Sequence, residues 1–142
     1  MYILKVKSTF DSAHFLKGYE GKCANIHGHR WVVEIEVSSE SVETEGTQRG
    51  MVVDFGILRD DLKHVTEKMD HTLIYELGSL KASTVQALES EGFALYEVGF
   101  RPTAENFAKY FYGIMKEKGY SVLRAGVYET PENYACYEEC RQ

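Results

Sequence analysis

The chain has 142 residues, of which 44% are hydrophobic and 27% are charged, and its formal net charge is −6. This length and balance fit one soluble globular domain, which we expect to span residues 1–142. The acidic charge, without a Lys/Arg cluster, argues against a nucleic acid partner, and no apolar run approaches the roughly 20 residues needed to cross a membrane.

The first two predicted elements are strands, over residues 2–10 and 31–38. The first begins MYILKVKSTF and lacks the basic, apolar and small-residue segments of a signal peptide, so we expect a cytoplasmic protein. Residues 39–50 are polar, end in glycine and are predicted to form a loop. In the second strand apolar side chains occupy every other position, the pattern of a half-buried antiparallel strand: Trp31, Val33, Ile35 and Val37.

A helix is predicted over residues 57–69, with Asp54 as its N-cap. His64 lies off its apolar face, so we interpret it as a surface histidine. Apolar residues recur along the helix at spacings of three and four and form one stripe, made of Phe55, Leu58, Leu62, Val65 and Met69.

A second, shorter helix is predicted over residues 83–91. Ser83 and Gln86 fit a capping box at its start, and Gly92 fits a stop at its end. It lies in a variable middle segment in which no strand is predicted.

A third helix is predicted from Thr103 to Gly119, and a hairpin of strands 121–129 and 133–139 follows it. The order of elements is strand, strand, helix, variable middle, helix, strand, strand. Hairpins at both ends with helices between them indicate an α+β fold, an antiparallel sheet with helices on one face. The buried stripe of the third helix comprises Phe107, Tyr110, Phe111 and Ile114.

The residues with metal chemistry concentrate in Cys23-Ala24-Asn25-Ile26-His27-Gly28-His29. Side chains two apart in a strand point to the same side, so His27 and His29 can reach one ion. Catalytic zinc sites use three protein ligands and leave the fourth position open. His14 is the candidate third ligand, because a hairpin of the first two strands would bring it back over the other two histidines.

This metal site has plainer alternatives. A His-x-His pair is weak evidence of metal binding by itself. Cys23 as a fourth ligand would close the site into a structural zinc centre with no catalytic role. The three cysteines lack the spacing of a disulfide framework, and we interpret Cys136 and Cys140 as structural or incidental.

Two further places carry titratable groups, each with two interpretations. Asp70-His71 follows the first helix, and alone it indicates a helix C-terminus with a cation near the negative end of the dipole. Glu129 shares a strand face with Ala125 and Val127. It either reaches solvent where the strand ends or accepts two N–H donors from a planar heterocycle.

Together these motifs resemble those of the pterin synthases: 6-pyruvoyl-tetrahydropterin synthase and its bacterial relative, 6-carboxy-tetrahydropterin synthase. They span residues 10–130 in the family's order, and only their combination is specific. The gap of three residues between Cys23 and His27 resembles the carboxy branch. The matching runs are Phe10-x-x-Ala13-His14, Lys22-Cys23-x3-His27-Gly28-His29, Met51-Val52-Val53-Asp54-Phe55, Asp70-His71, Pro102-Thr103-Ala104-Glu105-Asn106 and Glu129-Thr130.

The resemblance implies a fold, a reaction and an assembly. The fold is the α+β T-fold, a four-stranded antiparallel sheet with two main helices packed on one face. The reaction is a zinc-dependent lyase reaction that converts 7,8-dihydroneopterin triphosphate to 6-carboxy-tetrahydropterin, acetaldehyde and triphosphate, toward 7-deazaguanine nucleosides such as queuosine. The assembly is a homohexamer built from trimers, with active sites between subunits.

The resemblance also implies roles for residues around the metal. His14, His27 and His29 match the family's zinc ligands, and Cys23 matches its catalytic cysteine. A cysteine acts as a base in its thiolate form, which a nearby metal or imidazolium favours.

The same resemblance assigns the remaining site residues. Asp70 and His71 match the acidic and imidazole partners of the cysteine, contributed from a neighbouring subunit. Glu129 matches the carboxylate that anchors the pterin ring, and Thr103 lies where further contacts to that ring are expected.

Three departures from the family pattern bear on the choice of pterin. Thr72-Leu73 follows Asp70-His71 where the family has Leu-Asn, and segment 76–100 is longer than a minimal bacterial member needs. Arg30 follows the His-Gly-His run, and we interpret it as an exposed strand residue rather than a triphosphate contact. Two alternatives stay open: a pyruvoyl-type lyase acting on a related pterin, and a non-catalytic structural zinc-binding module.

Overall fold

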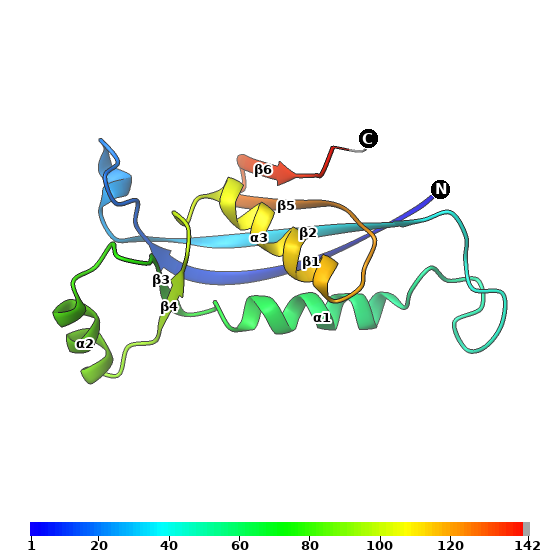
Figure 1. The fold of residues 1–142 in the computed structure, drawn as a ribbon, viewed down its shortest axis with the longest axis horizontal. Coiled ribbons are helices and arrows are strands. Elements are labelled where there is room, and N and C mark those ends of the chain that lie inside the picture. Colours follow the sequence, from blue (N-terminus) through cyan, green and yellow to red (C-terminus); the bar gives the residue numbers. More distant parts are fainter. Residues whose placement is uncertain (141–142) are drawn as a thin grey trace.

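The structure is a computed structural model that describes residues 1–140. It confirms the α+β class: one curled sheet carries helices against it (Figure 1). The sheet has six strands in the order β4-β3-β1-β2-β5-β6. The strands are β1 (Tyr2–His14), β2 (His27–Ser39), β3 (Thr72–Glu76), β4 (Leu95–Val98), β5 (Val122–Thr130) and β6 (Asn133–Tyr137), and the helices are α1 (Phe55–Glu67), α2 (Ala82–Ser90) and α3 (Ala104–Glu117).

The two long strands β1 and β2 form the centre of the sheet and pair antiparallel along their whole length. Tyr2 lies opposite Ser39 at one end, and His14 lies opposite His27 at the other. The predicted pairing is confirmed, but the predicted bounds were too short at the histidine end. The histidines therefore belong to the strands themselves, and the ladder of backbone hydrogen bonds fixes where their side chains point.

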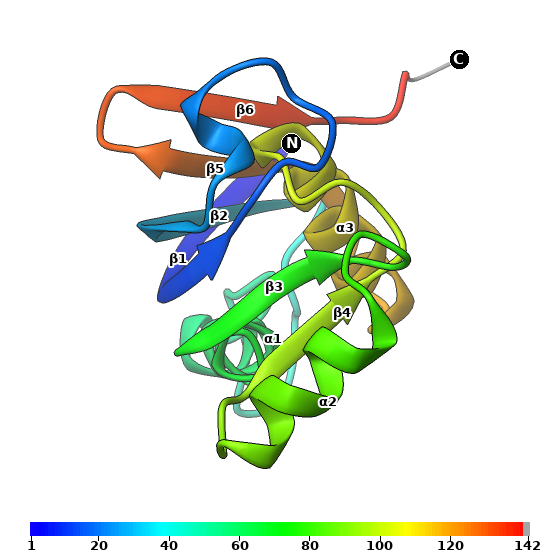
Figure 2. The same ribbon diagram turned by 90° about the vertical axis from the view of Figure 1, so that its left-hand side faces the viewer.

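The prediction of a four-stranded antiparallel sheet was wrong in strand number. β3 pairs parallel with β1, β4 pairs parallel with β3, and α2 connects these two (Figure 2). Parallel neighbours need a crossover connection, which explains why segment 76–100 is long. The two strands have five and four residues, TLIYE and LYEV, and neither shows the alternation of apolar and polar residues by which a half-buried strand is recognised in a sequence.

The two main helices pack on one face of the sheet, as predicted. Thr66 of α1 shares a 2.7 Å hydrogen bond with Ser8, and Phe107 of α3 lies edge-on to Phe10, which is on the same face of β1 as Ser8. Asp54 caps α1, where its carboxylate accepts from Gly56 N at 2.6 Å. The fully buried side chains of this core include Trp31, Phe10, Phe107, Phe111, Ile35, Leu58, Leu62 and Met69.

Two local predictions about the helices were wrong. The N-cap of α2 is Lys81, which makes no side-chain cap, so Ser83 and Gln86 do not form a capping box. Phe55 is 51% exposed and is not part of the buried stripe of α1. The ends of α2 and α3 follow the prediction, because Gly92 and Gly119 both take the left-handed backbone that favours glycine after a helix.

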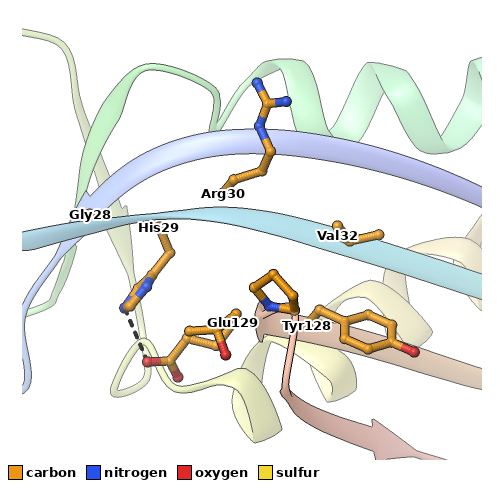
Figure 3. A pocket seen from close by; sticks show the side chains of 8 residues that line it. Gly28, His29, Arg30, Val32, Tyr128 and Glu129 are labelled. Carbon is orange, nitrogen blue, oxygen red and sulfur yellow. Dashed lines mark ion pairs between the residues drawn. The ribbon is translucent and has the colours of Figure 1, made fainter.

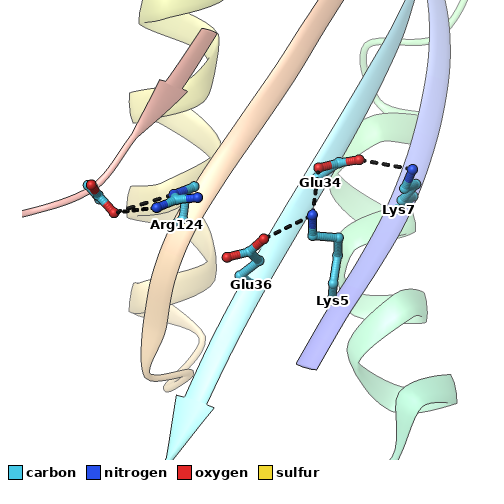
Figure 4. Close-up of polar contacts among 6 residues, drawn as sticks. Lys5, Lys7, Glu34, Glu36 and Arg124 are labelled. Carbon is cyan, nitrogen blue, oxygen red and sulfur yellow. Dashed lines mark hydrogen bonds and ion pairs between the residues drawn. The ribbon is translucent and has the colours of Figure 1, made fainter. Parts of the chain in front are cut away.

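The opposite face of the central strands is charged (Figure 4). Lys5 lies between two carboxylates, 3.1 Å from Glu34 and 2.9 Å from Glu36, and Lys7 is 2.9 Å from Glu34. Glu34 is only 6% exposed. Burial opposes its ionisation, but the bonds from the two lysines outweigh burial and lower the pKa of Glu34. The sheet thus separates an apolar face from a charged one.

Within residues 1–140, no helix is long and apolar enough to span a membrane. Cys136 and Cys140 are free and exposed, and Cys23 is free and half-buried.

Candidate functional site

Three imidazoles meet at one end of the sheet, on the face that the helices cover. His14 is the last residue of β1 and lies opposite His27, the first residue of β2, and His29 follows two residues later on the same side. The ring centroids lie 4.5, 5.0 and 4.9 Å apart in the three pairs. Trp31 continues the row, 5.0 Å from the ring of His14 and 5.3 Å from that of His29.

Backbone carbonyls hold two of these rings. The Nδ1 atom of His14 is 2.8 Å from the carbonyl oxygen of Pro102, and that of His27 is 2.7 Å from the carbonyl oxygen of Asn25. A carbonyl only accepts, so each Nδ1 carries the proton and donates it. The Nε2 atoms of both rings are then unprotonated and available as metal ligands.

The arrangement of these lone pairs fits a bound cation. The Nε2 atoms of His14 and His27 face each other at 3.1 Å, a repulsive contact when neither carries a proton. Two ligands of a tetrahedral zinc ion lie about 3.3 Å apart when each bond is 2.0–2.1 Å. A cation bound to both nitrogens would turn this repulsion into coordination, so the donor set fits zinc.

Glu129, near the end of β5, points toward His29 (Figure 3) and belongs to the same group of possible ligands as the three histidines. One ligand atom from each of His14, His27, His29 and Glu129 can be chosen so that all four lie within 4.8 Å of one another. Oε1 of Glu129 is 3.1 Å from Nε2 of His29. Cys23 does not belong to this group of neighbouring ligand atoms within residues 1–140.

Burial favours the neutral forms of His14 and His29. His14 is 1% exposed, and burial lowers its pKa from 6.5 to about 4. Burial also lowers the pKa of His29, although the charge of Glu129 opposes the shift. Neutral imidazole is the form that binds a metal, so the site is prepared for one at neutral pH.

Cys23 lies in a short 3₁₀ turn, Lys22–Ala24, between the first two strands. Its backbone carbonyl accepts from Leu16 N at 3.0 Å, which ties the turn to the chain that leaves β1. The thiol is thus held on a short connection that begins at His14 and ends at His27.

Asp70 and His71 form a contact that adjacent residues often cannot make. Oδ2 of Asp70 is 2.8 Å from Nδ1 of His71, while Oδ1 accepts from the backbone N–H of Asp11 at 2.8 Å. The second contact is the main cause that lowers the pKa of Asp70. His71 has a left-handed backbone with φ 58°, and its N–H donates to the Asp11 carbonyl at 2.7 Å.

The side chain of His71 is 78% exposed, and it is not among the neighbouring ligand atoms of the histidine group. It borders a cavity of about 390 Å³ lined with apolar residues, among them Ile26 and Phe93, which are 61% and 62% exposed. Large apolar side chains this exposed beside a polar group mark a surface that a partner can cover.

Two further residues have specific local partners. Thr103 caps α3, because its hydroxyl accepts from Asn106 N at 3.3 Å. Arg30 points away from His29 (Figure 3). It donates to both carboxylate oxygens of Asp11, at 3.0 and 3.1 Å. It is exposed, as expected, and it is also paired with Asp11.

Sequence reasoning missed the carbonyls of Pro102 and Asn25 and the proximity of Glu129 to His29. Every residue has a backbone carbonyl, so the residue types do not indicate which carbonyl contacts a histidine. For Glu129 a signal existed, because the period-2 rule places it on the same face as the histidines. Only the pairing of β2 with β5 shows that Glu129 and the histidines of β2 lie on neighbouring strands.

Comparisons with known proteins agree with this geometry. A sequence model of the family described as 6-pyruvoyl tetrahydropterin synthase matches residues 3–140. A Haemophilus influenzae protein named 6-carboxy-5,6,7,8-tetrahydropterin synthase is 34% identical over 98% of this chain and 100% of its own length. A Rickettsia bellii protein of the same name is also 34% identical, over 92% of this chain and 93% of its own length.

The fold has solved counterparts. A Plasmodium vivax 6-pyruvoyltetrahydropterin synthase, crystallised as a catalytic-residue mutant, superposes with a TM-score of 0.71 over 97% of each chain. A Caenorhabditis elegans 6-pyruvoyl tetrahydropterin synthase gives a TM-score of 0.67 over 98% of this chain and 96% of its own. At 20% and 22% identity these matches show the fold alone, and they confirm the expected T-fold.

Proposed function

The chain belongs to the 6-pyruvoyl tetrahydropterin synthase family, and we propose that it is a zinc-dependent 6-carboxy-5,6,7,8-tetrahydropterin synthase. The reaction would convert 7,8-dihydroneopterin triphosphate to 6-carboxy-tetrahydropterin, acetaldehyde and triphosphate, in the synthesis of 7-deazaguanine nucleosides. The observation that carries the proposal is the meeting of three imidazoles and one carboxylate at a single point of the fold. Full-length relatives that bear this name support the choice of reaction.

The proposed metal ligands are Nε2 of His14 and His27, with His29 as the third. When bound, zinc would act as a Lewis acid on the hydroxyl groups of the pterin side chain. The protein's part is to hold the ligands in place. The carbonyls of Pro102 and Asn25 fix two of the rings, and the packing of Trp31 restrains the third.

Two groups are proposed to move protons. Cys23, as a thiolate, removes a proton from a carbon of the pterin side chain. His71 takes and returns protons through Nε2, because Asp70 accepts from its Nδ1 at 2.8 Å and holds the ring in one orientation.

We further propose that active sites form between subunits of a trimer-based hexamer. Asp70 and His71 are not among the neighbours of the metal ligands within one chain, and exposed apolar side chains surround His71. A second subunit that covers this surface could bring His71 of one chain to Cys23 of another. The cytoplasmic location stays a prediction from the sequence.

The pterin ring is proposed to bind at Glu129. A planar pterin presents neighbouring N–H donors, and a carboxylate can accept two of them at once. Glu129 lines an open cavity of about 500 Å³ together with Tyr128, Thr130 and Pro131, which leaves room for a flat ring. Thr103 would contribute through its backbone, since its hydroxyl already caps α3.

Product analysis tests the proposal. The zinc-loaded protein is incubated with 7,8-dihydroneopterin triphosphate, acetaldehyde is measured with alcohol dehydrogenase and NADH, and the pterin is identified by mass spectrometry. Equal amounts of acetaldehyde and 6-carboxy-tetrahydropterin are expected. A 6-pyruvoyl product without acetaldehyde would instead identify a pyruvoyl-type lyase, and no turnover by the zinc-loaded protein would favour a structural zinc module.

A further inference from the structure

Glu129 occupies a position that pterin binding alone does not explain. Its carboxylate turns toward His29, and Oε1 lies 3.1 Å from Nε2 of that ring (Figure 3). The side chain is 28% exposed and that of His29 is 17% exposed, so the contact is largely shielded from water. Binding of a pterin ring alone does not require the carboxylate to contact a proposed metal ligand.

The contact between these two atoms is not a hydrogen bond. Nε2 of His29 is buried and has no hydrogen-bond partner among residues 1–140, although Oε1 of Glu129 is well within hydrogen-bonding distance. The angle at the ring nitrogen therefore does not direct an N–H toward the carboxylate. Two atoms that lie side by side in this way resemble two ligands directed at a common point.

The chemistry of the four groups leads to the same arrangement. Three imidazoles and one carboxylate make a complete four-coordinate zinc set, and one ligand atom from each of these residues lies within 4.8 Å of the others. A complete set leaves no open position for the substrate. Catalysis would then require one ligand to leave, and Glu129 is the one whose carboxylate has a second use.

We propose that Glu129 is an exchangeable fourth ligand, which closes the metal site in the free protein and leaves the metal when its carboxylate binds the N–H donors of a pterin ring. This inference rests on the proposed function and deepens it. Two N–H donors on a planar ring would engage both carboxylate oxygens and turn the carboxylate toward the ring, which competes with its bond to the metal. Recognition of the ring would thereby open the coordination position that the pterin side chain needs.

The test asks whether the fourth position is accessible to a small neutral ligand. The protein is loaded with Co²⁺ in place of zinc, and imidazole binding is followed by visible absorption at pH 8. Glu129→Gln keeps the size of the side chain but removes its negative charge. Glu132→Gln, in the exposed turn after β5, is the matched control.

Imidazole should bind the Glu129→Gln protein at least about tenfold more tightly than the wild type or the Glu132→Gln protein, if the closed form of the wild type is favoured by about ten to one. 7,8-Dihydropterin, which carries the ring without the side-chain hydroxyls, should raise the imidazole affinity of the wild type toward that of Glu129→Gln. Its binding is followed separately by its own fluorescence.

Equal imidazole affinity in the wild type and Glu129→Gln would overturn the proposal. So would bound 7,8-dihydropterin that leaves the imidazole affinity of the wild type unchanged. Either result would leave Glu129 as an anchor for the ring only and would not affect the proposed function. That function depends on product formation by the zinc-loaded wild type, which the acetaldehyde assay measures independently.

Discussion

The Nε2 atoms of His14 and His27 lie 3.1 Å apart, and the Nδ1 atom of each ring donates to a backbone carbonyl. When both rings are neutral, neither Nε2 atom can donate to the other without breaking one of those carbonyl bonds. The strand register that places His14 opposite His27 thus forces two lone pairs together. A cation is the partner that satisfies both.

Removal of one of these rings should therefore abolish tight metal binding. We expect His27→Ala to lose stoichiometric zinc after dialysis against a weak chelator, measured by metal analysis. Trp31, the only tryptophan, lies 5.0 Å from the His14 ring, so its fluorescence should respond to zinc in the wild type but not in the variant. His64→Ala, on the exposed side of α1, is the control and should bind zinc normally. Retention of one tightly held zinc ion by His27→Ala would refute the ligand assignment.

The thiol of Cys23 is predicted to serve chemistry rather than coordination. Cys23→Ala should keep its zinc and its oligomeric state, because the close group of ligand atoms is made of three histidines and Glu129. Turnover should fall by about 10²–10⁴-fold, the usual cost of losing a general base. Zinc content, size-exclusion chromatography and initial rates test the three parts. A zinc-free but otherwise folded Cys23→Ala protein would show instead that the cysteine is a ligand.

Two substitutions at His71 distinguish the effect of backbone strain on stability from the effect of proton transfer on turnover. Asn tolerates the left-handed backbone that His71 adopts, whereas Val does not. We expect His71→Asn to unfold close to the wild type in urea, and His71→Val to lose about 1–2 kcal/mol of unfolding free energy. Both variants should lose about 10²–10⁴-fold in turnover, because neither can transfer the proton. Full activity in His71→Asn would exclude His71 from the mechanism.

The metal-free protein should lose stability in mild acid. The pKa of His14 is about 4 in the folded protein and 6.5 as a free group, so below pH 6.5 the unfolded chain binds the proton more readily. The free energy of unfolding should fall as the pH drops from 6.5 to 4, by about 3 kcal/mol in all for this residue, and level off below. His29, whose pKa burial also lowers, contributes in the same direction.

Urea unfolding of the chelator-treated protein at several pH values measures this loss. His14→Phe should show a shallower dependence between pH 6.5 and 4, whereas His64→Gln should follow the wild type. Parallel curves for the wild type and His14→Phe would mean that His14 is not buried in its neutral form.

The sequence by itself determined the features that depend on local order. The alternation Trp31, Val33, Ile35 predicted β2 and placed His27 and His29 on its inner side, since side chains two apart in a strand share a face. Asp54 predicted the start of α1, because an N-cap needs only its own side chain and the next two or three amides. The family resemblance rested on motifs of this local kind and is confirmed over nearly the whole chain.

Only the tertiary structure decided what depends on distant segments. Strands β3 and β4 are short, and parallel pairing of β3 with β1 and of β4 with β3 makes them strands. The Pro102 carbonyl reaches His14 across 88 residues, and β5 brings Glu129 to His29 across 100 residues. Such contacts are set by strand register and packing between elements, which no local pattern encodes, and they make three histidines and one carboxylate a single site.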